Sequence, residues 1–295
     1  MVVAFCPRCV LRHEVAEVGA GVSMNKMAEL IARLKRLSRA SILPSGAGHN
    51  GGIQQLIVKG TKLRFAALEG DTGDQIHQGY EEEVYEYILK VPRGAVFFDL
   101  GASIGNFSLF SAAHGLKTYA FEPDPKNFEA LELNRRANDF AELRTFEIAI
   151  SDGANPHGIL MSNSKKQRRG DHHKVLRVLE NSAHSSVVGQ LDTEHTVRTL
   201  SLDQAIEQLN LPVPDYMKID IDGSEVAFFN GAAKTLADPQ LKGLMIELYK
   251  ESPFYPCLLR TLADANFELE AEFQITSAGQ LDAGLFNMEY VRKQR

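Results

Sequence analysis

Two acids and two glycines, placed at the ends of neighbouring apolar runs, are the residues of this chain best suited to ligand chemistry. The run at residues 96–100 contains Asp99 and opens into Gly101 and Gly105. A second apolar run ends at Glu122, 23 residues after Asp99. An acid at this distance, after the second strand of an α/β unit, can accept hydrogen bonds from ribose hydroxyls. The pattern predicts a nucleoside-binding unit of strand, glycine turn, helix and strand.

The glycine spacing separates two classes of cofactor. A dinucleotide site has the denser pattern Gly-x-Gly-x-x-Gly, because a pyrophosphate approaches backbone amides at a helix N-terminus. This chain reads Asp-x-Gly-x-x-x-Gly from Asp99 to Gly105. S-adenosylmethionine has no phosphate and needs an open turn, which glycines provide because they lack a Cβ. The spacing therefore favours S-adenosylmethionine and a methyltransferase.

The elements that would position these residues alternate between strand and helix, as a parallel sheet requires. We expect strands at 95–100, 117–121, 144–150, 216–221 and 244–248, and helices at 106–114, 125–138, from 201, 223–237 and 253–265. Two final strands, 267–274 and 285–292, have no helix between them and should form an antiparallel hairpin. The expected fold class is α/β, a Rossmann-like class I methyltransferase fold with a mostly parallel seven-stranded sheet.

Three regions are expected along the chain. Residues 1–50 form an N-terminal extension, with an amphipathic helix at 24–40 and a Gly-rich linker from Pro44. Residues 51–92 form a cap made of a β-hairpin around Lys59-Gly60 and a helix stopped by Pro92. Residues 93–295 form the methyltransferase domain, with an insertion at about 154–196 where the α/β pattern stops.

Composition excludes several classes of protein. A net charge of −6 argues against general nucleic-acid binding, which favours basic domains. No run of 18 apolar residues suggests a membrane span, and the first 23 residues do not resemble a secretory signal. Three cysteines do not suggest a disulfide framework and favour a cytoplasmic location. Cys6 and Cys9 could form half of a zinc site, with His13 as a third ligand, but a structural site needs four ligands and the remaining cysteine, Cys257, lies far along the chain.

Four blocks in order give the chain a family resemblance. They are Phe98-Asp-Leu-Gly-Ala-Ser-Ile-Gly-Asn-Phe-Ser108, Ala120-Phe-Glu-Pro-Asp-Pro125, Ala149-Ile-Ser-Asp-Gly153 and Lys218-Ile-Asp-Ile-Asp-Gly-Ser-Glu225. Residues 74–250 resemble the FkbM family of S-adenosylmethionine-dependent methyltransferases. The family usually has Glu in place of Asp222 and often Asn in place of Ser103. The resemblance implies methylation of a hydroxyl on a sugar, polyketide or related small molecule.

Three segments are expected to bind the cofactor. The turn after Asp99 would hold the methionine end, Glu122 the ribose, and residues 149–152 the adenine. The expected contacts are Asp99, Gly101, Ala102, Ser103, Gly105, Asn106, Glu122, Pro123, Ala149, Ser151, Asp152 and Asp220.

Acids after the fourth strand are the candidates for the general base that an alcohol acceptor requires. Asp220, Asp222 and Glu225 follow this strand, and alternation would place Asp220 and Asp222 on one face with Lys218. Lys218 could orient the acceptor or form a structural ion pair. Glu225 could instead stabilise the start of a helix. His184 is a further catalytic candidate in the serine-rich segment of the insertion.

Two ligand possibilities and two rival functions stay open. Asp220 or Asp222 with Glu247 could bind a divalent cation, although no metal is expected. The basic stretch 163–173 could be a lid that recognises an acidic acceptor, or a solvated insertion. The rivals are a non-catalytic methyltransferase-like domain and a nucleic-acid methyltransferase, against which the absence of tryptophan and of an Asn-Pro-Pro-aromatic block also argues. Oligomeric state is left undetermined.

Overall fold

A seven-stranded sheet forms the centre of the fold in a computed structural model that describes residues 53–66, 81–162, 175–178, 193–277 and 280–293. The expected helix at 24–40, Cys6, Cys9, the basic stretch at 163–173 and His184 lie outside these ranges. The strand order is β12-β13-β11-β10-β3-β4-β5. The strands are β3 (Val96–Leu100), β4 (Lys117–Phe121), β5 (Leu143–Phe146), β10 (Tyr216–Ile219), β11 (Gly243–Tyr249), β12 (Phe267–Ser277) and β13 (Gln280–Arg292).

The direction of this sheet confirms the expected class I methyltransferase fold. β13 is antiparallel to β11 and β12, while the pairs from β11 to β5 are all parallel. The chain proceeds from β3 through β4 to β5 in one direction and through β10 to β11 in the other. This reversal makes the carboxyl ends of β3 and β10 the switch point where α/β sheets bind ligands.

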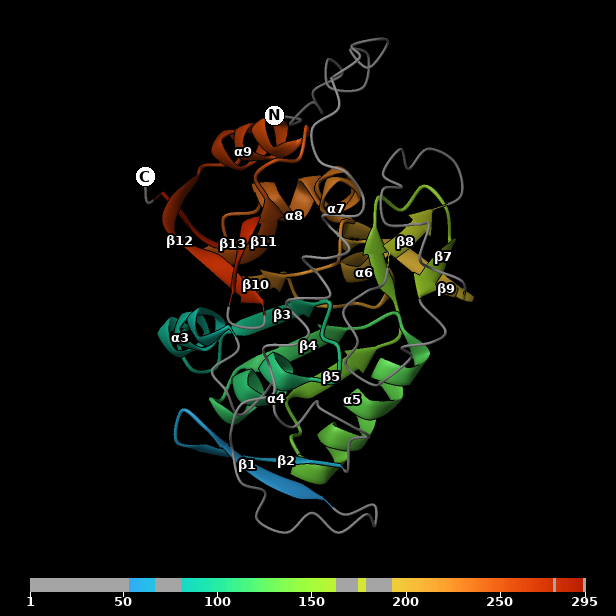
Figure 1. Ribbon diagram of the computed structural model, residues 1–295, viewed down its shortest axis with the longest axis vertical. Helices are drawn as coiled ribbons and strands as arrows, with labels where there is room; N and C mark the ends of the chain where they lie inside the picture. The colour runs from blue at the N-terminus through green and yellow to red at the C-terminus, as the bar shows by residue number, and fades with distance from the viewer. Residues whose placement is uncertain (1–52, 67–80, 163–174, 179–192, 278–279, 294–295) are drawn as a thin grey trace.

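Helices cover both faces of the sheet (Figure 1). One layer contains α3 (Glu82–Lys90), α4 (Asn106–Ala113) and α5 (Pro125–Asn138), and the other contains α6 (Leu202–Gln208), α7 (Glu225–Gly231), α8 (Ala233–Ala237) and α9 (Tyr255–Asp264). Successive β3 side chains enter the two layers in turn, Phe97 on the α3 side and Phe98 on the α7 side, and both are fully buried. β3 is therefore a central strand, and Asp99 shares the face of Phe97.

Local sequence determines several helix ends as predicted. Asp124 accepts hydrogen bonds from Lys126 N and Asn127 N and caps α5, which begins at Pro125. Ser201 and Gln204 form the expected capping box at α6. Gly115 follows α4 with φ +91°.

Two expected elements are each divided. The strand expected at 144–150 becomes β5 and β6 (Ala149–Ser151), because β4 pairing ends at Phe146 and β6 pairs with β9 (Thr193–Ser201). β9 continues a second sheet with β7 (His157–Ser162) and β8 (Val175–Val178), within the segment expected to be an insertion. The helix expected at 223–237 breaks at Ala232, and the Asp203 carboxylate caps α8 by accepting from Lys234 N and Thr235 N.

The expected N-terminal hairpin packs on the same core as the sheet. β1 (Gln54–Val58) and β2 (Thr61–Phe65) pair antiparallel around Lys59-Gly60. Leu63 and Phe65 join Val84 and Phe97 in one buried cluster.

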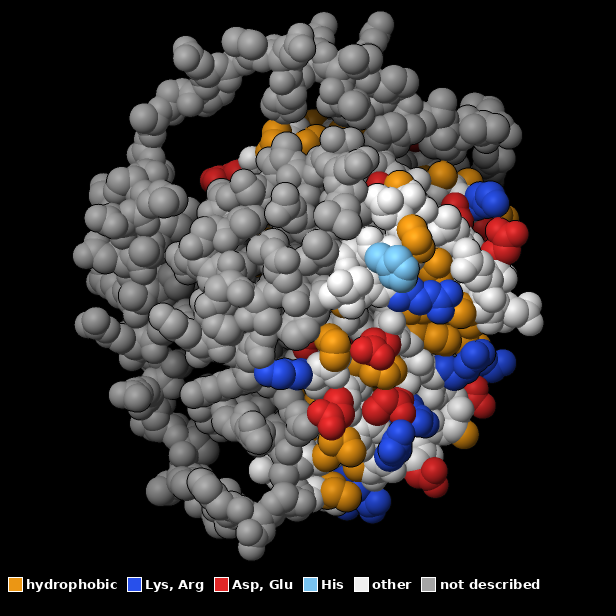
Figure 2. Space-filling model, turned by 90° about the vertical axis from the view of Figure 1, so that its right-hand side faces the viewer, with side chains coloured by type: hydrophobic (Ala, Val, Ile, Leu, Met, Phe, Trp, Pro, Cys, Tyr) orange, Lys and Arg blue, Asp and Glu red, His pale blue; other side chains and the backbone are white. Residues whose placement is uncertain are grey.

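Figure 2 shows acidic and basic side chains intermingled with scattered hydrophobic ones over the described part of one face. Among the described helices, none has the length and apolar character needed to cross a bilayer.

Candidate functional site

The turn after β3 packs directly on the end of β10. Gly101 has φ +83°, and a Cβ placed there would lie 1.7 Å from the carbonyl oxygen of Asp220. The Asp220 N–H donates to Leu100 O at 3.0 Å. Glycine is thus required by both conformation and close approach. The contact joins the predicted cofactor turn to the predicted acceptor side.

Asp99 is fully buried and only partly satisfied. Its Oδ2 accepts a 2.5 Å hydrogen bond from Ser108 Oγ. Its Oδ1 lies 3.8 Å from Lys218 Nζ, too far for a hydrogen bond, and has no hydrogen-bond partner among the described residues. Burial raises the pKa of Asp99, and the charge of Lys218 and the Ser108 bond oppose that effect. A ligand with an N–H or O–H donor would satisfy this oxygen.

Glu122 links the turn after β3 to the turn after β4. Its two oxygens accept hydrogen bonds from Ser103 N at 2.7 Å and Asp124 N at 2.8 Å. Ser103 presents its N–H from a left-handed conformation with φ +50°. A carboxylate oxygen can accept more than one hydrogen bond, so an acid at this position is suited to ribose hydroxyls. The two backbone amides therefore fix the orientation of the Glu122 carboxylate beside the glycine turn.

Lys218 is a buried link within the site. Its Nζ donates to Asp220 Oδ2 at 2.9 Å and to Gly101 O at 3.3 Å, and it lies 5.2 Å from the Phe107 ring centroid. Burial alone would lower the pKa of Lys218, but Asp220 and Asp99 raise it above its ordinary value. With a residue exposure of 3%, Lys218 is placed to hold the two turns together. These contacts favour the structural ion pair over direct orientation of an acceptor.

Asp222 lies in a turn after β10, which changes one expectation. β10 ends at Ile219, and Asp222 and Gly223 both have positive φ, at +49° and +91°. The prediction that strand alternation places Asp220 and Asp222 on one face is therefore wrong. Burial raises the pKa of Asp222, and the charges of Asp220 and Glu225 raise it further. Asp220 and Asp222 still interact electrostatically.

Glu225 is the first residue of α7. Its Oε1 accepts from Gly223 N, in the turn before the helix, at 3.1 Å. A carboxylate in the first turn of a helix is also favoured by the helix dipole. Burial raises the pKa of Glu225 to about 7, and the charge of Asp220 contributes, although local backbone hydrogen bonds oppose this shift. A carboxylate with this pKa can exchange a proton near neutrality.

A third acid from a different element joins the site. Oxygens of Glu81, Asp220 and Glu247 all lie within 4.8 Å of one another, and carboxylate oxygens are the donors that hard divalent cations prefer. Asp220 and Glu247, one of the two expected pairs, are thus brought together, and Glu81 joins them in place of the alternative Asp222. Burial raises the pKa of Glu247, with further contributions from Asp220 and Glu81.

The remaining expected cofactor segment lies at the end of β6. Ala149 and Ser151 are buried, and the Asp152 carboxylate accepts from Ala154 N at 2.9 Å. Within the described part of the chain, the buried side-chain polar atoms without a hydrogen-bond partner are Asp99 Oδ1, Asn106 Oδ1 and Ser151 Oγ. All three residues are among the expected cofactor contacts. Buried polar groups are normally paired, so these atoms fit a polar ligand that lies against them.

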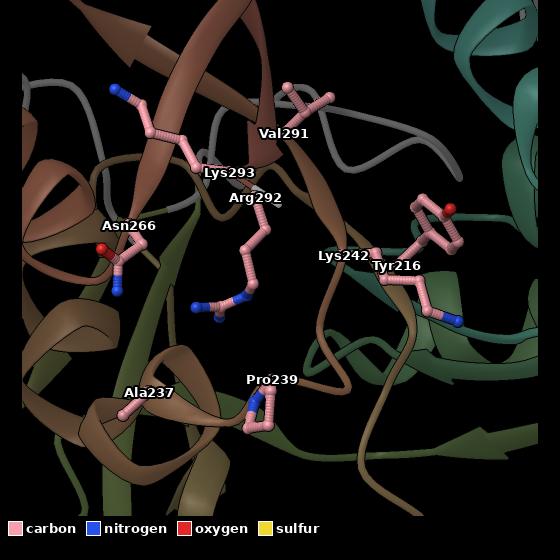
Figure 3. A pocket seen from close by; sticks show the side chains of 8 residues that line it. All are labelled: Tyr216, Ala237, Pro239, Lys242, Asn266, Val291, Arg292 and Lys293. Carbon is pink, nitrogen blue, oxygen red and sulfur yellow. The ribbon is translucent and has the colours of Figure 1, made fainter. Parts of the chain in front are cut away.

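A separate pocket of about 720 Å³ lies at the other end of the parallel strands from the site (Figure 3). It is lined by Tyr216, Ala237, Pro239, Lys242, Asn266, Val291, Arg292 and Lys293. It adjoins the start of β10, whereas the site lies past its end. The Arg292 guanidinium points into it and donates to Leu236 O, Leu241 O and Ala265 O at 2.5–2.7 Å. Arg292 therefore ties the last strand to neighbouring loops and does not belong to the expected site.

Two site residues were not assigned a role from the sequence. Ser108, which orients Asp99, is the last residue of the block from Phe98 to Ser108 that carries the family resemblance. Its position on the helix that follows Asp99 could have predicted this contact. Glu81 has no such signal, because it stands in a run of three glutamates and reaches the site only through the packing of α3. His184, the other catalytic candidate, lies outside the described residues.

Comparison with known proteins identifies the family of this chain. The Methyltransferase FkbM domain family matches residues 99–269. The chain is 25% identical over 157 residues to the hexuronic acid methyltransferase AglP of Haloferax volcanii, covering 53% of this chain and 58% of that protein. It is 30% identical over 175 residues to the 31-O-demethyl-FK506 methyltransferase FkbM of Streptomyces tacrolimicus, covering 53% of this chain and 66% of that protein.

The chain thus spans less than two thirds of the length of these curated relatives. A solved structure, Aeropyrum pernix fibrillarin with S-adenosyl-L-methionine, aligns with a TM-score of 0.41 at 12% identity, over 84% of this chain and 85% of that chain. The family match covers more than half of the 295 residues and includes the glycine turn and the acids after β10. The chain therefore belongs to the FkbM family of methyltransferase domains.

Proposed function

We propose that this chain is an S-adenosylmethionine-dependent O-methyltransferase that acts on a hydroxyl of a sugar, polyketide or related small molecule. The observation that carries the cofactor is the set of unpartnered buried atoms on Asp99, Asn106 and Ser151. Each residue belongs to a different part of the expected cofactor path: the end of β3, the start of α4 and the end of β6. The family match supports methyl transfer.

The chain's main contribution would be alignment. S-adenosylmethionine, when bound, supplies an activated methyl group on a positively charged sulfur. Asp99 and the turn from Gly101 would hold the amino-acid end, while Glu122, already oriented by two amides, would accept from the ribose. Correct alignment of reacting atoms can contribute roughly 7–11 kcal/mol to catalysis.

The acids after β10 would take the proton that an alcohol loses on methylation. Glu225 is the preferred base, because its pKa of about 7 lets it accept a proton near neutral pH. Asp222 and Asp220 remain alternatives. A positioned base of this kind contributes about 10²–10⁴-fold to a rate. Lys218 would keep Asp220 and the Gly101 turn in register and would not contact the acceptor.

The acceptor class rests on family membership and charge. The two curated relatives are named as methyltransferases of a hexuronic acid and of 31-O-demethyl-FK506, and the second name specifies an oxygen. The net charge of −6 favours such small molecules over nucleic acid. The cysteine content favours a cytoplasmic location. No metal is required by this proposal.

Transfer of a labelled methyl group tests the proposal. The purified chain would be incubated with methyl-tritiated S-adenosylmethionine and with neutral glycosides, uronic acids, macrolide polyketides or RNA. We expect alkali-stable label in a hydroxylated small molecule, absent when Asp99→Ala replaces the wild-type chain. Label in RNA alone would support the nucleic-acid rival. Cofactor binding without transfer to any acceptor would support the non-catalytic rival.

A further inference from the structure

Tyr249 exposes an aromatic side chain where β11 ends. Its residue exposure is 41%, and the carboxyl ends of parallel strands are where α/β sheets bind ligands. The large hydrophobic residues that are exposed in the described part of the chain are Ile53, Ile57, Leu89, Leu133, Tyr249 and Leu269. Of these, Tyr249 is the one that forms the carboxyl end of a parallel strand. Within the described residues, it is therefore the exposed apolar side chain best placed to meet a ligand.

Strand alternation places Tyr249 on the same face of the sheet as Glu247. Leu248 belongs to the core cluster on the α7 side, whereas Met245 belongs to the cluster on the α3 side. Glu247 and Tyr249 follow Met245 at intervals of two residues and share its face. The carboxylates of Glu247 and Asp220 lie within 4.8 Å of each other. Two residues of strand span roughly 6.6 Å, so the tyrosine lies next to these acids along the strand.

Contacts with the neighbouring chain hold the Tyr249 ring in place. Gly284 packs against it so closely that a Cβ added to Gly284 would lie 2.5 Å from Tyr249 Cε2. The Tyr249 hydroxyl donates to Glu251 Oε2 at 2.7 Å. The Lys250 N–H donates to Gly284 O at 2.7 Å, which joins the two backbones beside the ring. A side chain held in this way loses little conformational entropy when a ligand binds to it.

One exposed aromatic ring beside several carboxylates matches the chemistry of a pyranose. A sugar ring has C–H bonds on its faces and hydroxyls around its edge. The negative face of an aromatic ring attracts such C–H bonds, and carboxylates like those of Glu247 and Glu251 accept hydrogen bonds from hydroxyls. A macrolactone polyketide has a much larger apolar surface, whose burial requires several apolar side chains. The described residues at the carboxyl end of β11 therefore favour a sugar.

We propose that Tyr249 binds the methyl acceptor by stacking on a pyranose ring, and that this contact selects a sugar over a macrolactone. The inference rests on the proposed function and narrows its acceptor class. Stacking on Tyr249 would leave the sugar hydroxyls beside the acids at the ends of β10 and β11. The reaction is that of the proposed function: a sugar oxygen gains the methyl group, the sulfur loses it, and the hydroxyl proton passes to the base.

Steady-state methyl transfer with the full chain tests this assignment. The acceptors are the methyl pyranosides of glucose, galactose, mannose and fucose, and a hydroxylated macrolactone. Tyr249→Leu keeps an apolar side chain without the ring, whereas Tyr249→Phe keeps the ring and loses the bond to Glu251. We expect Tyr249→Leu to raise KM for the best pyranoside about five- to tenfold and to leave kcat within about twofold of wild type. Tyr249→Phe should restore KM to within about twofold of wild type, because the ring makes the contact.

Leu269→Ala is the matched control. Leu269 is 46% exposed and pairs with Tyr290, which is opposite Leu244 near the start of β11. This substitution removes an exposed apolar side chain far from the carboxyl end of the strand and should leave KM unchanged. Substitutions of exposed residues usually change stability little. An unchanged Kd for S-adenosylhomocysteine in all three variants would show that the cofactor site is intact.

The outcomes separate the inference from the proposed function. If a pyranoside is methylated but Tyr249→Leu has the KM of wild type, the inference is wrong and the proposed function stands. Methylation of the macrolactone and of no pyranoside has the same meaning. If the wild-type chain does not bind S-adenosylhomocysteine, or methylates neither kind of acceptor, the inference and the proposed function both fail.

Discussion

Gly101 packs against the backbone of Asp220 so closely that a Cβ added to Gly101 would lie 1.7 Å from the Asp220 carbonyl oxygen. The glycine of the cofactor turn is therefore required by contact with the strand that carries the acceptor-side acids. This contact, with the Lys218 bonds to Gly101 O and Asp220 Oδ2, makes the two halves of the site one structural unit.

Alanine at Gly101 should damage this unit. A side chain at φ +83° costs about 1–2 kcal/mol by itself, and the clash with the Asp220 backbone adds to that cost. We expect Gly101→Ala to reduce the free energy of unfolding by at least ~2 kcal/mol and to abolish binding of S-adenosylhomocysteine. Gly60→Ala is the matched control, because Gly60 has φ +79° and a Cβ added there would meet open space, with nothing within 4 Å. Denaturant unfolding measures both variants. An equal loss of unfolding free energy in Gly101→Ala and Gly60→Ala would show that the Asp220 contact does not contribute to the requirement for glycine.

Replacement of Glu122 by glutamine should weaken cofactor binding while the chain stays folded. The glutamine amide has one acceptor oxygen, whereas the two Glu122 oxygens accept from Ser103 N and Asp124 N. The turn after β3 would lose one of these bonds, and the ribose would lose an anionic acceptor. We expect at least about a fivefold rise in Kd for S-adenosylhomocysteine, since a hydrogen bond to a charged group contributes about 1.5–3 kcal/mol. The control is Glu142→Gln, because Glu142 lies on the exposed surface before β5. If Glu122→Gln bound S-adenosylhomocysteine as tightly as Glu142→Gln does, Glu122 would not be the ribose acceptor.

Lys218 should act by position and charge together. Lys218→Met leaves the buried Asp99 without its cation, and breaking a buried pair in this way costs about 3–5 kcal/mol. The corresponding surface change, Lys242→Met, breaks an exposed pair with Asp215 and should cost no more than about 1 kcal/mol. Lys218→Arg should recover part of the stability and of the cofactor affinity. Unfolding and calorimetry on the three variants check this order. A Lys218→Met variant that retains wild-type stability and affinity would contradict the positioning role.

The raised pKa of Glu225 predicts how stability changes with pH. Burial raises this pKa from its ordinary value of 4.5 to about 7 in the folded chain, so the folded state binds the proton more tightly than the unfolded state. The resulting contribution to stability is fully present below pH ~4.5 and is lost as the pH rises to ~7. Glu225→Gln should therefore flatten the decline in unfolding free energy between about pH 5 and 7. Guanidine unfolding across that range provides the measurement, and parallel curves for variant and wild type would show that Glu225 does not carry this proton.

Local patterns in the sequence were sufficient to predict the parts of the fold that depend on local rules. The apolar run before Asp99 correctly predicted β3. Asp124 and Pro125 predicted the start of α5, and Ser201 with Gln204 predicted the capping box of α6. The chain order of strands and helices gave the mostly parallel sheet and its terminal hairpin.

The unpredicted parts depend on tertiary packing. The run of glutamates at residues 81–83 does not distinguish Glu81, which enters the site, from Glu82, which pairs with Lys59 on the surface. That division depends on how α3 docks against Asn287 and Glu289, about two hundred residues later in the chain. Alternation failed at Asp222 because β10 stops early and a left-handed turn follows.

Calorimetric titration of the wild-type chain and of Asp99→Ala with S-adenosylhomocysteine, with NAD as the comparison ligand, is the most direct test of the cofactor site. We expect wild type to bind S-adenosylhomocysteine and not NAD. We expect Asp99→Ala to lose this binding, because the buried carboxylate with its unpartnered oxygen is gone. Binding of NAD in place of S-adenosylhomocysteine, or an Asp99→Ala variant with unchanged affinity, would contradict the assignment of this site.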